Sequence, residues 1–183
     1  MKNPFFALIA ALVVLVSCTA RGQEGSARND VRQAFSTAGL PLLSSPISAR
    51  DFSLTALTGE NVRLEELRGR VVILYFWASW CGPCRAGMPS LDALYNKYRE
   101  QGLKVLAVNQ REEQTAVLNF INDNGYTFSV LMDRDGAVGA AYGVRALPTI
   151  FIVDQEGRII VRRVGGFDWT NPRIHAALEK LLE

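Results

Sequence analysis

The chain has 183 residues, of which 49% are hydrophobic and 21% are charged, and its formal net charge at pH 7 is +2. This length and this mix predict one globular domain with a substantial core. The small net charge, and the lack of a cluster of Lys and Arg interleaved with aromatic residues, argue against a nucleic-acid-binding protein.

The start of the chain has the pattern of an export signal. Lys2 supplies a short positive segment, and residues 5–16 form an apolar stretch without charge. Because a membrane-spanning helix needs ~20 apolar residues, we expect residues 1–17 to be a signal peptide instead. The stretch ends in LVSC at residues 15–18, which resembles a bacterial lipobox, so we expect lipidation of Cys18. The alternative is an ordinary signal peptide that happens to contain a cysteine.

Residues 18–45 are predicted to be a lipidated, flexible tether. This segment is rich in small and polar residues, and only residues 31–38 favour a short helix. Gly39, Pro41 and Pro46 would stop anything longer. A flexible tether with a lipid anchor would let the domain reach partners near the membrane surface.

The folded domain is expected to span residues 46–183 and to open with a β-hairpin. Apolar and polar residues alternate over 52–56, as in a half-buried strand. A turn at 58–61 leads to a returning strand at 62–64, and a short helical turn follows at 65–67.

An apolar run at residues 71–76 predicts a strand that is buried on both faces. After residue 84 the apolar residues switch to helical spacing, so the pair Cys81 and Cys84 lies where a strand turns into a helix. The first turn of a helix has free backbone N–H groups and a partial positive charge, which favour a thiolate over a thiol. Pro83 suits this position because its φ angle is preset and its missing N–H is not needed there.

Strands and helices alternate through the rest of the chain. Strands are predicted at 103–108, 128–132, 150–153 and 159–164, and helices at 112–124, 135–142 and from Pro172 onward. This alternation predicts a parallel sheet, and the closing hairpin adds antiparallel strands that make the sheet mixed.

The two cysteines are close enough in the chain to bridge each other. In that arrangement Cys81 is the exposed, attacking sulfur, and Cys84 is the more buried sulfur that resolves the mixed disulfide. Two other uses stay open. A structural zinc site needs about four ligands, and the chain offers only Cys18 and His175 besides the pair. A purely structural disulfide in so short a loop removes little entropy from the unfolded state.

The segment WASWCGPCR at residues 77–85, followed closely by Met-Pro, resembles the active site of thioredoxin-fold proteins. The Met-Pro pair is similar to the exported TlpA/ResA-like branch of thiol-disulfide oxidoreductases, in its lipoprotein form. Leu-Pro-Thr at 147–149 matches the second active-site segment of that family. The resemblance covers about residues 46–183. It implies an α/β fold in which helices flank a mixed central sheet, with an N-terminal β-hairpin and a helix-strand insertion at 112–132.

The resemblance also implies an active site without a metal or a cofactor. The catalytic and supporting residues are then Cys81, Cys84, Trp80, Gly82, Pro83, Leu147 and Pro148. In the family, Pro148 is a cis-proline that faces the cysteine pair, and the backbone of Leu147 is open to an extended substrate. Trp80 packs beside Cys81 in the family and shields one side of the disulfide.

Two positions depart from the family pattern. Thioredoxins carry a buried Asp where this chain has Tyr75, and many ResA-like proteins carry a Glu where it has Gly87. Either carboxylate could accept the proton of the resolving thiol. The proton acceptor for Cys84, the reduction potential and the direction of electron flow are therefore left open.

The resemblance implies a monomeric, lipid-anchored thiol-disulfide oxidoreductase of the bacterial cell envelope. The expected reaction is the reduction of disulfides in envelope proteins such as apocytochrome c, with a DsbD/CcdA-type membrane protein as electron donor.

Two alternatives belong to other functional classes. A redoxin-type peroxidase would carry Thr where Ala78 stands. A Sco-like copper carrier would have three residues between its cysteines, whereas two separate Cys81 from Cys84.

Overall fold

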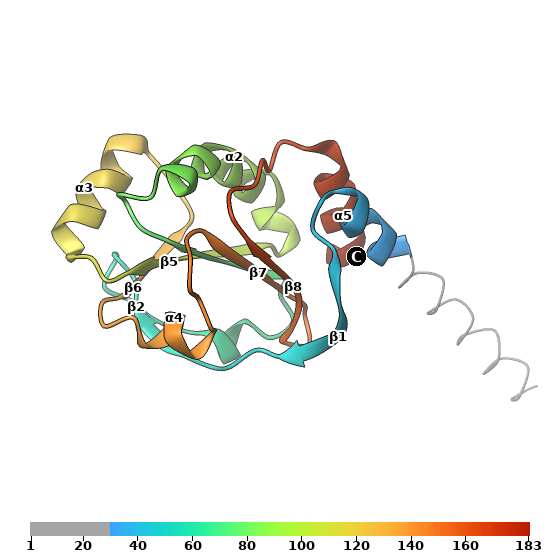
Figure 1. Ribbon diagram of the computed structural model, residues 1–183, viewed down its shortest axis with the longest axis horizontal. Coiled ribbons are helices and arrows are strands. Elements are labelled where there is room, and N and C mark those ends of the chain that lie inside the picture. The colour runs from blue at the N-terminus through green and yellow to red at the C-terminus, as the bar shows by residue number, and fades with distance from the viewer. Residues whose placement is uncertain (1–29) are drawn as a thin grey trace, which may run out of the picture.

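The computed structural model describes residues 30–183 (Figure 1). The predicted signal peptide at residues 1–17, the lipidation of Cys18 and the first part of the tether lie outside the described residues. Within 30–183, no helix combines the length and the apolar character that a membrane crossing requires.

A six-stranded mixed sheet lies at the centre, with the strand order β1-β8-β7-β4-β5-β6. Its strands are β1 (Leu42–Ser48), β4 (Val72–Trp77), β5 (Lys104–Gln110), β6 (Ser129–Asp133), β7 (Thr149–Val153) and β8 (Arg158–Val164). The neighbours β4, β5 and β6 are parallel, whereas β7 is antiparallel to both β4 and β8. The prediction of a mixed sheet that is completed by a closing hairpin is confirmed.

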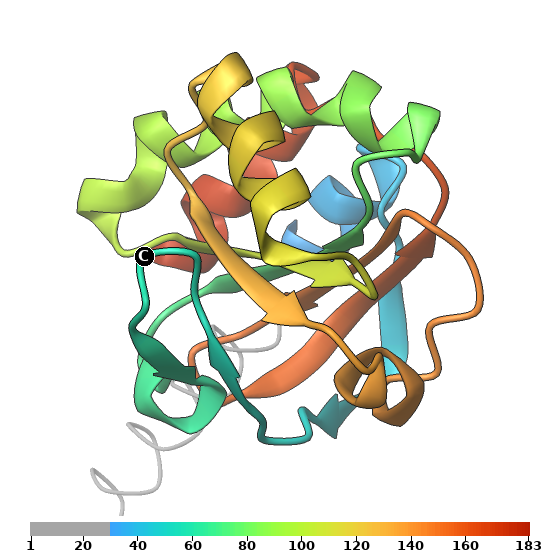
Figure 2. The same cartoon turned by 90° about the vertical axis from the view of Figure 1, so that its left-hand side faces the viewer.

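Helices and a small hairpin cover the two faces of the sheet (Figures 1 and 2). One face carries α2 (Gly82–Tyr98), the 3-10 turn η2 (Arg99–Gln101), α3 (Gln114–Asn124) and α5 (Pro172–Leu182). The opposite face carries η1 (Leu64–Leu67), α4 (Ala137–Ala141) and the hairpin of β2 (Ser53–Thr55) and β3 (Asn61–Arg63). Each face therefore has its own hydrophobic core.

The central strand β4 contributes to both cores. All six of its residues are buried, as the unbroken apolar run predicts. Its odd-numbered side chains, Tyr75 among them, join the core beneath α2, and its even-numbered side chains join the core on the α4 face. Since burying one large apolar side chain stabilises a fold by ~1.5–3 kcal/mol, β4 is a rigid base for the loop that follows it.

The folded part of the chain begins before residue 46. Residues 30–37 are helical, and Phe35 and Leu40 are completely buried in the core beneath α2. β1 then pairs antiparallel with β8. The prediction that residues 30–45 belong to a flexible tether is wrong, because the few apolar side chains of this polar stretch pack against the domain.

The two additions that the family resemblance implies are both present. The N-terminal hairpin pairs Ser53 with Arg63 and Thr55 with Asn61. The helix-strand insertion forms α3 and β6, and β6 extends the sheet beyond β5. A bridge between Ala56 and Leu131 brings the hairpin against this edge strand.

Candidate active site

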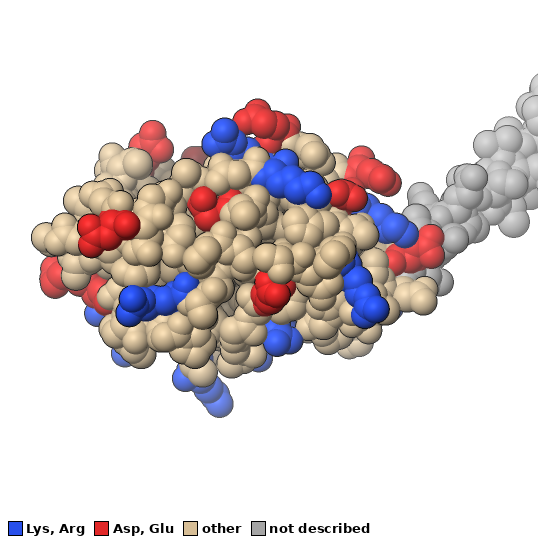
Figure 3. Space-filling view, turned by 90° about the horizontal axis from the view of Figure 1, so that it is seen from above, with Lys and Arg blue, Asp and Glu red and all other residues tan. Residues whose placement is uncertain are grey.

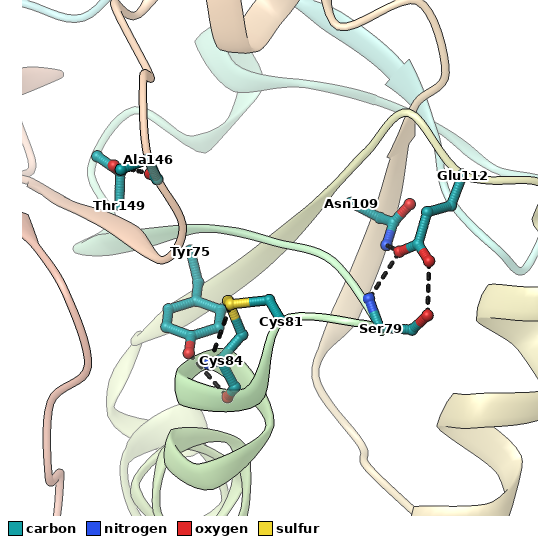
Figure 4. The surroundings of a disulfide bond; sticks show 8 residues. All are labelled: Tyr75, Ser79, Cys81, Cys84, Asn109, Glu112, Ala146 and Thr149. Atoms are coloured by element: carbon teal, nitrogen blue, oxygen red, sulfur yellow. Dashed lines mark hydrogen bonds between the residues drawn. A yellow bond between two sulfur atoms is a disulfide. The ribbon is translucent and has the colours of Figure 1, made fainter.

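Cys81 and Cys84 form a disulfide at the start of α2 (Figure 4). Their Cα atoms lie 5.2 Å apart. Cys81 is the N-cap residue, and its Sγ accepts a hydrogen bond of 3.2 Å from the backbone N–H of Cys84. Pro83 lies in the first turn of this 17-residue helix, as predicted. The sulfur of Cys81 thus receives a free N–H at the positive end of a long helix, which stabilises a thiolate in the reduced protein.

The two sulfurs differ in exposure, but less than expected. Cys84 is completely buried, and Cys81 is only 5% exposed, so the prediction of an exposed Cys81 is wrong for the disulfide form. Trp80 is 72% exposed, so most of its indole faces solvent instead of shielding the disulfide. In the disulfide form a partner protein can therefore contact little of Cys81, whereas the preceding residue, Trp80, is largely accessible.

The Leu147–Pro148 peptide bond is cis, as the family resemblance implies. Thr149 pairs with Phe76 near the end of β4, so Pro148 lies at the edge of the sheet from which the loop to α2 leaves. Figure 4 shows Ala146 and Thr149, which flank this dipeptide, hydrogen-bonded to each other at 2.7 Å. The backbone of Leu147 makes no hydrogen bond with another described residue, so it remains available to an extended segment of a partner.

Tyr75 stands beneath α2, where thioredoxins have an Asp. Its hydroxyl donates a hydrogen bond of 2.9 Å to the backbone carbonyl of Cys84. Burial, and to a smaller degree the neighbouring Tyr126, raise the pKa of Tyr75 well above its ordinary value. Tyr75 therefore stays protonated at neutral pH and acts as a hydrogen-bond donor, not as a base for the resolving thiol.

Gly87 lies on the buried side of α2, one turn beyond Cys84. A Cβ atom at this position would lie 3.2 Å from the backbone oxygen of Phe167 and 3.4 Å from the hydroxyl of Tyr75. A Cβ atom here would be in tight contact with the backbone of the loop before α5, which would have to shift by a few tenths of an ångström. Close packing accounts for the glycine, and no carboxylate stands here.

Sequence reasoning missed a carboxylate beside the active-site loop. Glu112, between β5 and α3, accepts hydrogen bonds through Oε2 from the N–H of Ser79 at 2.7 Å and from Nδ2 of Asn109 at 2.6 Å. Its Oε1 accepts a third, of 2.5 Å, from the Ser79 hydroxyl (Figure 4). Ser79 is two residues before Cys81. No local pattern joins positions that are 33 residues apart.

Two open hollows flank the first turns of α2. The larger has a volume of about 640 Å³, lies toward the loop before α5, and is lined by residues that include Pro83, Gly87, Gly166 and Phe167. The smaller has a volume of about 380 Å³, lies toward α3, and is lined by residues that include Gly82, Arg85, Phe120 and Tyr126. Seen from above, this face of the domain mixes acidic and basic side chains (Figure 3). The two hollows offer room for a polypeptide partner on either side of the first turns of α2.

His175 lies in α5, at the other end of α2 from the cysteines. Its Nδ1 is 3.0 Å from the hydroxyl of Tyr98, the last residue of α2. A 17-residue helix is ~25 Å long, so His175 is remote from the pair. Among residues 30–183, no three His, Cys, Asp or Glu side chains gather closely enough to hold a metal ion.

A Cys-x-x-Cys disulfide at the start of a helix, in a domain that also has a cis-prolyl peptide at the same edge of the sheet, defines the class of thiol-disulfide oxidoreductases with a thioredoxin-like fold. Comparison with known proteins gives the same answer. Residues 47–162 match the AhpC/TSA family. The chain belongs to this family and, within it, to the ResA-like thiol-disulfide oxidoreductases.

Relatives of known name support this placement. The chain is 36% identical over 133 residues to the thiol-disulfide oxidoreductase ResA of Bacillus anthracis, across 73% of this chain and 76% of the relative. It is 43% identical over 112 residues to ResA of Geobacillus kaustophilus, across 61% of this chain and 64% of the relative.

Solved structures show the same fold. StoA from Bacillus subtilis superimposes with a TM-score of 0.62 at 26% identity, covering 72% of this chain and 99% of StoA. The dsbF structure of MTB, in mixed oxidized and reduced forms, gives a TM-score of 0.62 at 29% identity, covering 69% of this chain and 94% of dsbF.

Proposed function

We propose that this oxidoreductase is an exported, lipid-anchored reductase of protein disulfides in the bacterial envelope. The observation that carries the proposal is the Cys81–Cys84 disulfide at the positive end of α2, with the Cys84 N–H directed at the sulfur of Cys81. That arrangement supports Cys81 as the nucleophile and Cys84 as the resolving residue.

The reaction transfers two electrons from the dithiol to a substrate disulfide. The Cys81 thiolate attacks one substrate sulfur, a mixed disulfide forms, and the other substrate sulfur leaves as a thiolate that takes up a proton. Cys84 then loses its proton and attacks the sulfur of Cys81. The Cys81–Cys84 bond forms, and the second substrate thiolate is released. Since Tyr75 is protonated and Gly87 has no side chain, we assign the proton of Cys84 to water.

The supporting residues have separate roles in this proposal. Gly82 and Pro83 set the spacing of the cysteines in the first turn of α2. The free backbone of Leu147, next to Pro148, pairs with an extended substrate segment that carries the disulfide. Trp80, 72% exposed, offers this segment an apolar contact.

The cellular setting rests on the start of the sequence. We propose that residues 1–17 are removed as a signal peptide and that Cys18 is lipidated, which tethers a monomeric domain to the membrane. Substrates are then envelope proteins with oxidised cysteines, such as apocytochrome c, and a DsbD/CcdA-type membrane protein restores the dithiol. The relatives' name, thiol-disulfide oxidoreductase, supports disulfide exchange and says nothing about these partners.

The decisive experiment compares three activities of the full chain: reduction of insulin disulfides, consumption of peroxide and binding of copper. We expect insulin reduction that depends on Cys81, and a stable mixed disulfide when Cys84→Ser is mixed with envelope extract. Peroxide consumption or copper binding without insulin reduction would overturn the proposal. Mass spectrometry of the mature N-terminus tests the anchor separately, and an unlipidated N-terminus would refute that part.

A further inference from the structure

The loop that presents Cys81 has few anchors of its own. Residues 78–80 lie between β4 and α2 and belong to neither. The N–H of Cys81 donates to the carbonyl of Ala78 within the loop at 3.1 Å. Ala78 is buried in the core beneath α2, whereas Trp80 is 72% exposed. Among the described residues of this loop, Ser79 is the one that hydrogen-bonds to a side chain of another segment.

Ser79 is fixed by Glu112. Both its backbone N–H and its hydroxyl donate to this one carboxylate, and the amide of Asn109 donates as well. Hydrogen bonds to an ionised acceptor are about twice as strong as those between neutral groups. Asn109 pairs with Trp77 at the end of the parallel strands β4 and β5, so the carboxylate ties the loop after one strand to the end of its neighbour.

The carboxylate also brings a negative charge to the loop before Cys81. The positive end of α2 favours a thiolate on Cys81, whereas a nearby negative charge disfavours it. A less stable thiolate makes a dithiol a stronger reductant, because the reduced form is the one that loses stability. Two other charged or titratable residues contact the pair: the Tyr75 hydroxyl donates to the carbonyl of Cys84, and the N–H of Arg85 donates to the carbonyl of Cys81. Both residues stay unchanged in the variants.

We propose that Glu112 is a positioning residue for disulfide exchange. It holds Ser79 so that Cys81 stays at the N-cap of α2, and its charge keeps the pair reducing by opposing the Cys81 thiolate. This proposal rests on the attacking role of Cys81 in the proposed function.

The chain offers variants that separate the two effects. Glu112→Gln keeps the shape: its amide oxygen still accepts from Ser79 and Asn109, and its NH₂ group donates to the Ser79 hydroxyl. Glu112→Ala removes both charge and contacts. Glu113→Gln is a matched control, because Glu113 is the next residue, its side chain is 80% exposed, and its ion pair within residues 30–183 is with Arg134.

The measurement is the rate of Cys81 alkylation against pH in a Cys84→Ser background, which gives the pKa of Cys81 without any protein substrate. For Glu112→Gln we expect a lower pKa of Cys81, with a ratio of thiolate to thiol at a given pH about threefold or more above that of the parent. When Glu112→Gln is made in the protein that keeps both Cys81 and Cys84, the reduction potential of the pair should rise, so the pair becomes a weaker reductant. Glu113→Gln should match the parent in both measurements.

Glu112→Ala tests the positioning effect. Once corrected for thiolate fraction, mixed-disulfide formation with a small disulfide should be about tenfold slower, because Cys81 is no longer held at the helix start. If this variant fails to fold, Ser79→Ala, which loses one of the three contacts, should show a smaller slowing in the same direction.

An unchanged Cys81 pKa in Glu112→Gln would overturn the electrostatic part. Unchanged exchange rates per thiolate in Glu112→Ala or, where that variant does not fold, in Ser79→Ala would overturn the positioning part. Insulin reduction that survives Cys81→Ser would instead refute the proposed function, so the two failures are distinguishable.

Discussion

At its N-terminus α2 carries the Cys81–Cys84 disulfide, with an open hollow on either side. At its C-terminus Tyr98 donates a hydrogen bond of 2.6 Å to Glu179 of α5, and His175 and Lys97 complete a polar cluster. One end leaves backbone groups free for a sulfur and for a partner, whereas the other is tied to a neighbouring helix. The difference indicates that the C-terminal end of α2 (the far end) is fixed against α5, whereas the N-terminal end (the near end) is accessible to partners. Changes at the near end should alter chemistry, and changes at the far end should alter stability.

The largest effect should come from Cys81→Ser. Insulin reduction should fall to the background of the assay, since the remaining sulfur of the pair, on Cys84, is completely buried. The free energy of unfolding should change by about 2 kcal/mol at most, because the loop that the disulfide closes is very short. Insulin turnover and denaturant unfolding of the same samples check both claims. Residual turnover well above background would show that Cys81 is not the nucleophile.

Gly87→Glu should disturb both properties, because Gly87 lies near the pair and is buried. The new side chain meets the backbone oxygen of Phe167, and overpacking of this kind costs about 1–3 kcal/mol. The added carboxylate should also raise the thiol pKa values of the pair, since a like charge disfavours the thiolate. Gly87→Ala is the control, because it adds bulk without charge. Thiol titration measures the pKa effect, and denaturant unfolding measures the loss of stability. Thiol pKa values and a free energy of unfolding equal to those of the parent would contradict the prediction.

Much of the framework follows from local patterns in the sequence. The β4 strand and α2 were predictable, because a run of apolar residues that gives way to helical spacing has few other solutions. The hairpin followed from the alternation at residues 52–56 and the turn at 58–61, whereas the cis-proline followed from the family motif. The helix at residues 30–37 was not predicted as part of the domain, since its local signal is weak and Phe35 becomes buried only when the rest of the fold is present.

The parts of the site that escaped prediction depend on contacts between distant segments. Glu112 meets Ser79 because β4 and β5 pair in a particular register, with Trp77 opposite Asn109. Gly87 is explained by the Phe167 backbone, 80 positions further along the chain. Neither contact produces a periodic pattern or a bias in composition that could be recognised in the sequence.

Tyr98→Phe tests the far end of α2. Loss of the hydroxyl removes its hydrogen bond to Glu179 and its contact with Nδ1 of His175. A net contribution of about 1 kcal/mol is typical of such a hydrogen bond, so the free energy of unfolding should fall by about that amount. Insulin reduction should keep the parent rate. A loss of insulin reduction at an unchanged free energy of unfolding would show that the far end of α2 contributes to the chemistry and not to stability.

The smallest effect should come from His175 and should appear as a dependence of stability on pH. Burial, and then the neighbouring Lys97, lower the pKa of His175 in the folded protein. In the unfolded chain its pKa returns to about 6.5, so below that pH the unfolded state binds a proton more readily. The contribution to stability is complete above about pH 6.5 and is lost as the pH falls toward the lower folded pKa.

Denaturant unfolding from about pH 7.5 to about pH 5.5 should therefore show a steeper loss of stability in the parent than in His175→Gln. Tyr98 and Lys97 lower the pKa of Glu179 as well, but that carboxyl titrates below this window and does not add to the difference. Parallel curves for the parent and the variant would show that the His175 site does not depress its pKa. Insulin reduction, measured per thiolate of Cys81, should respond equally to pH in both proteins, because His175 lies a helix length away from the sulfurs.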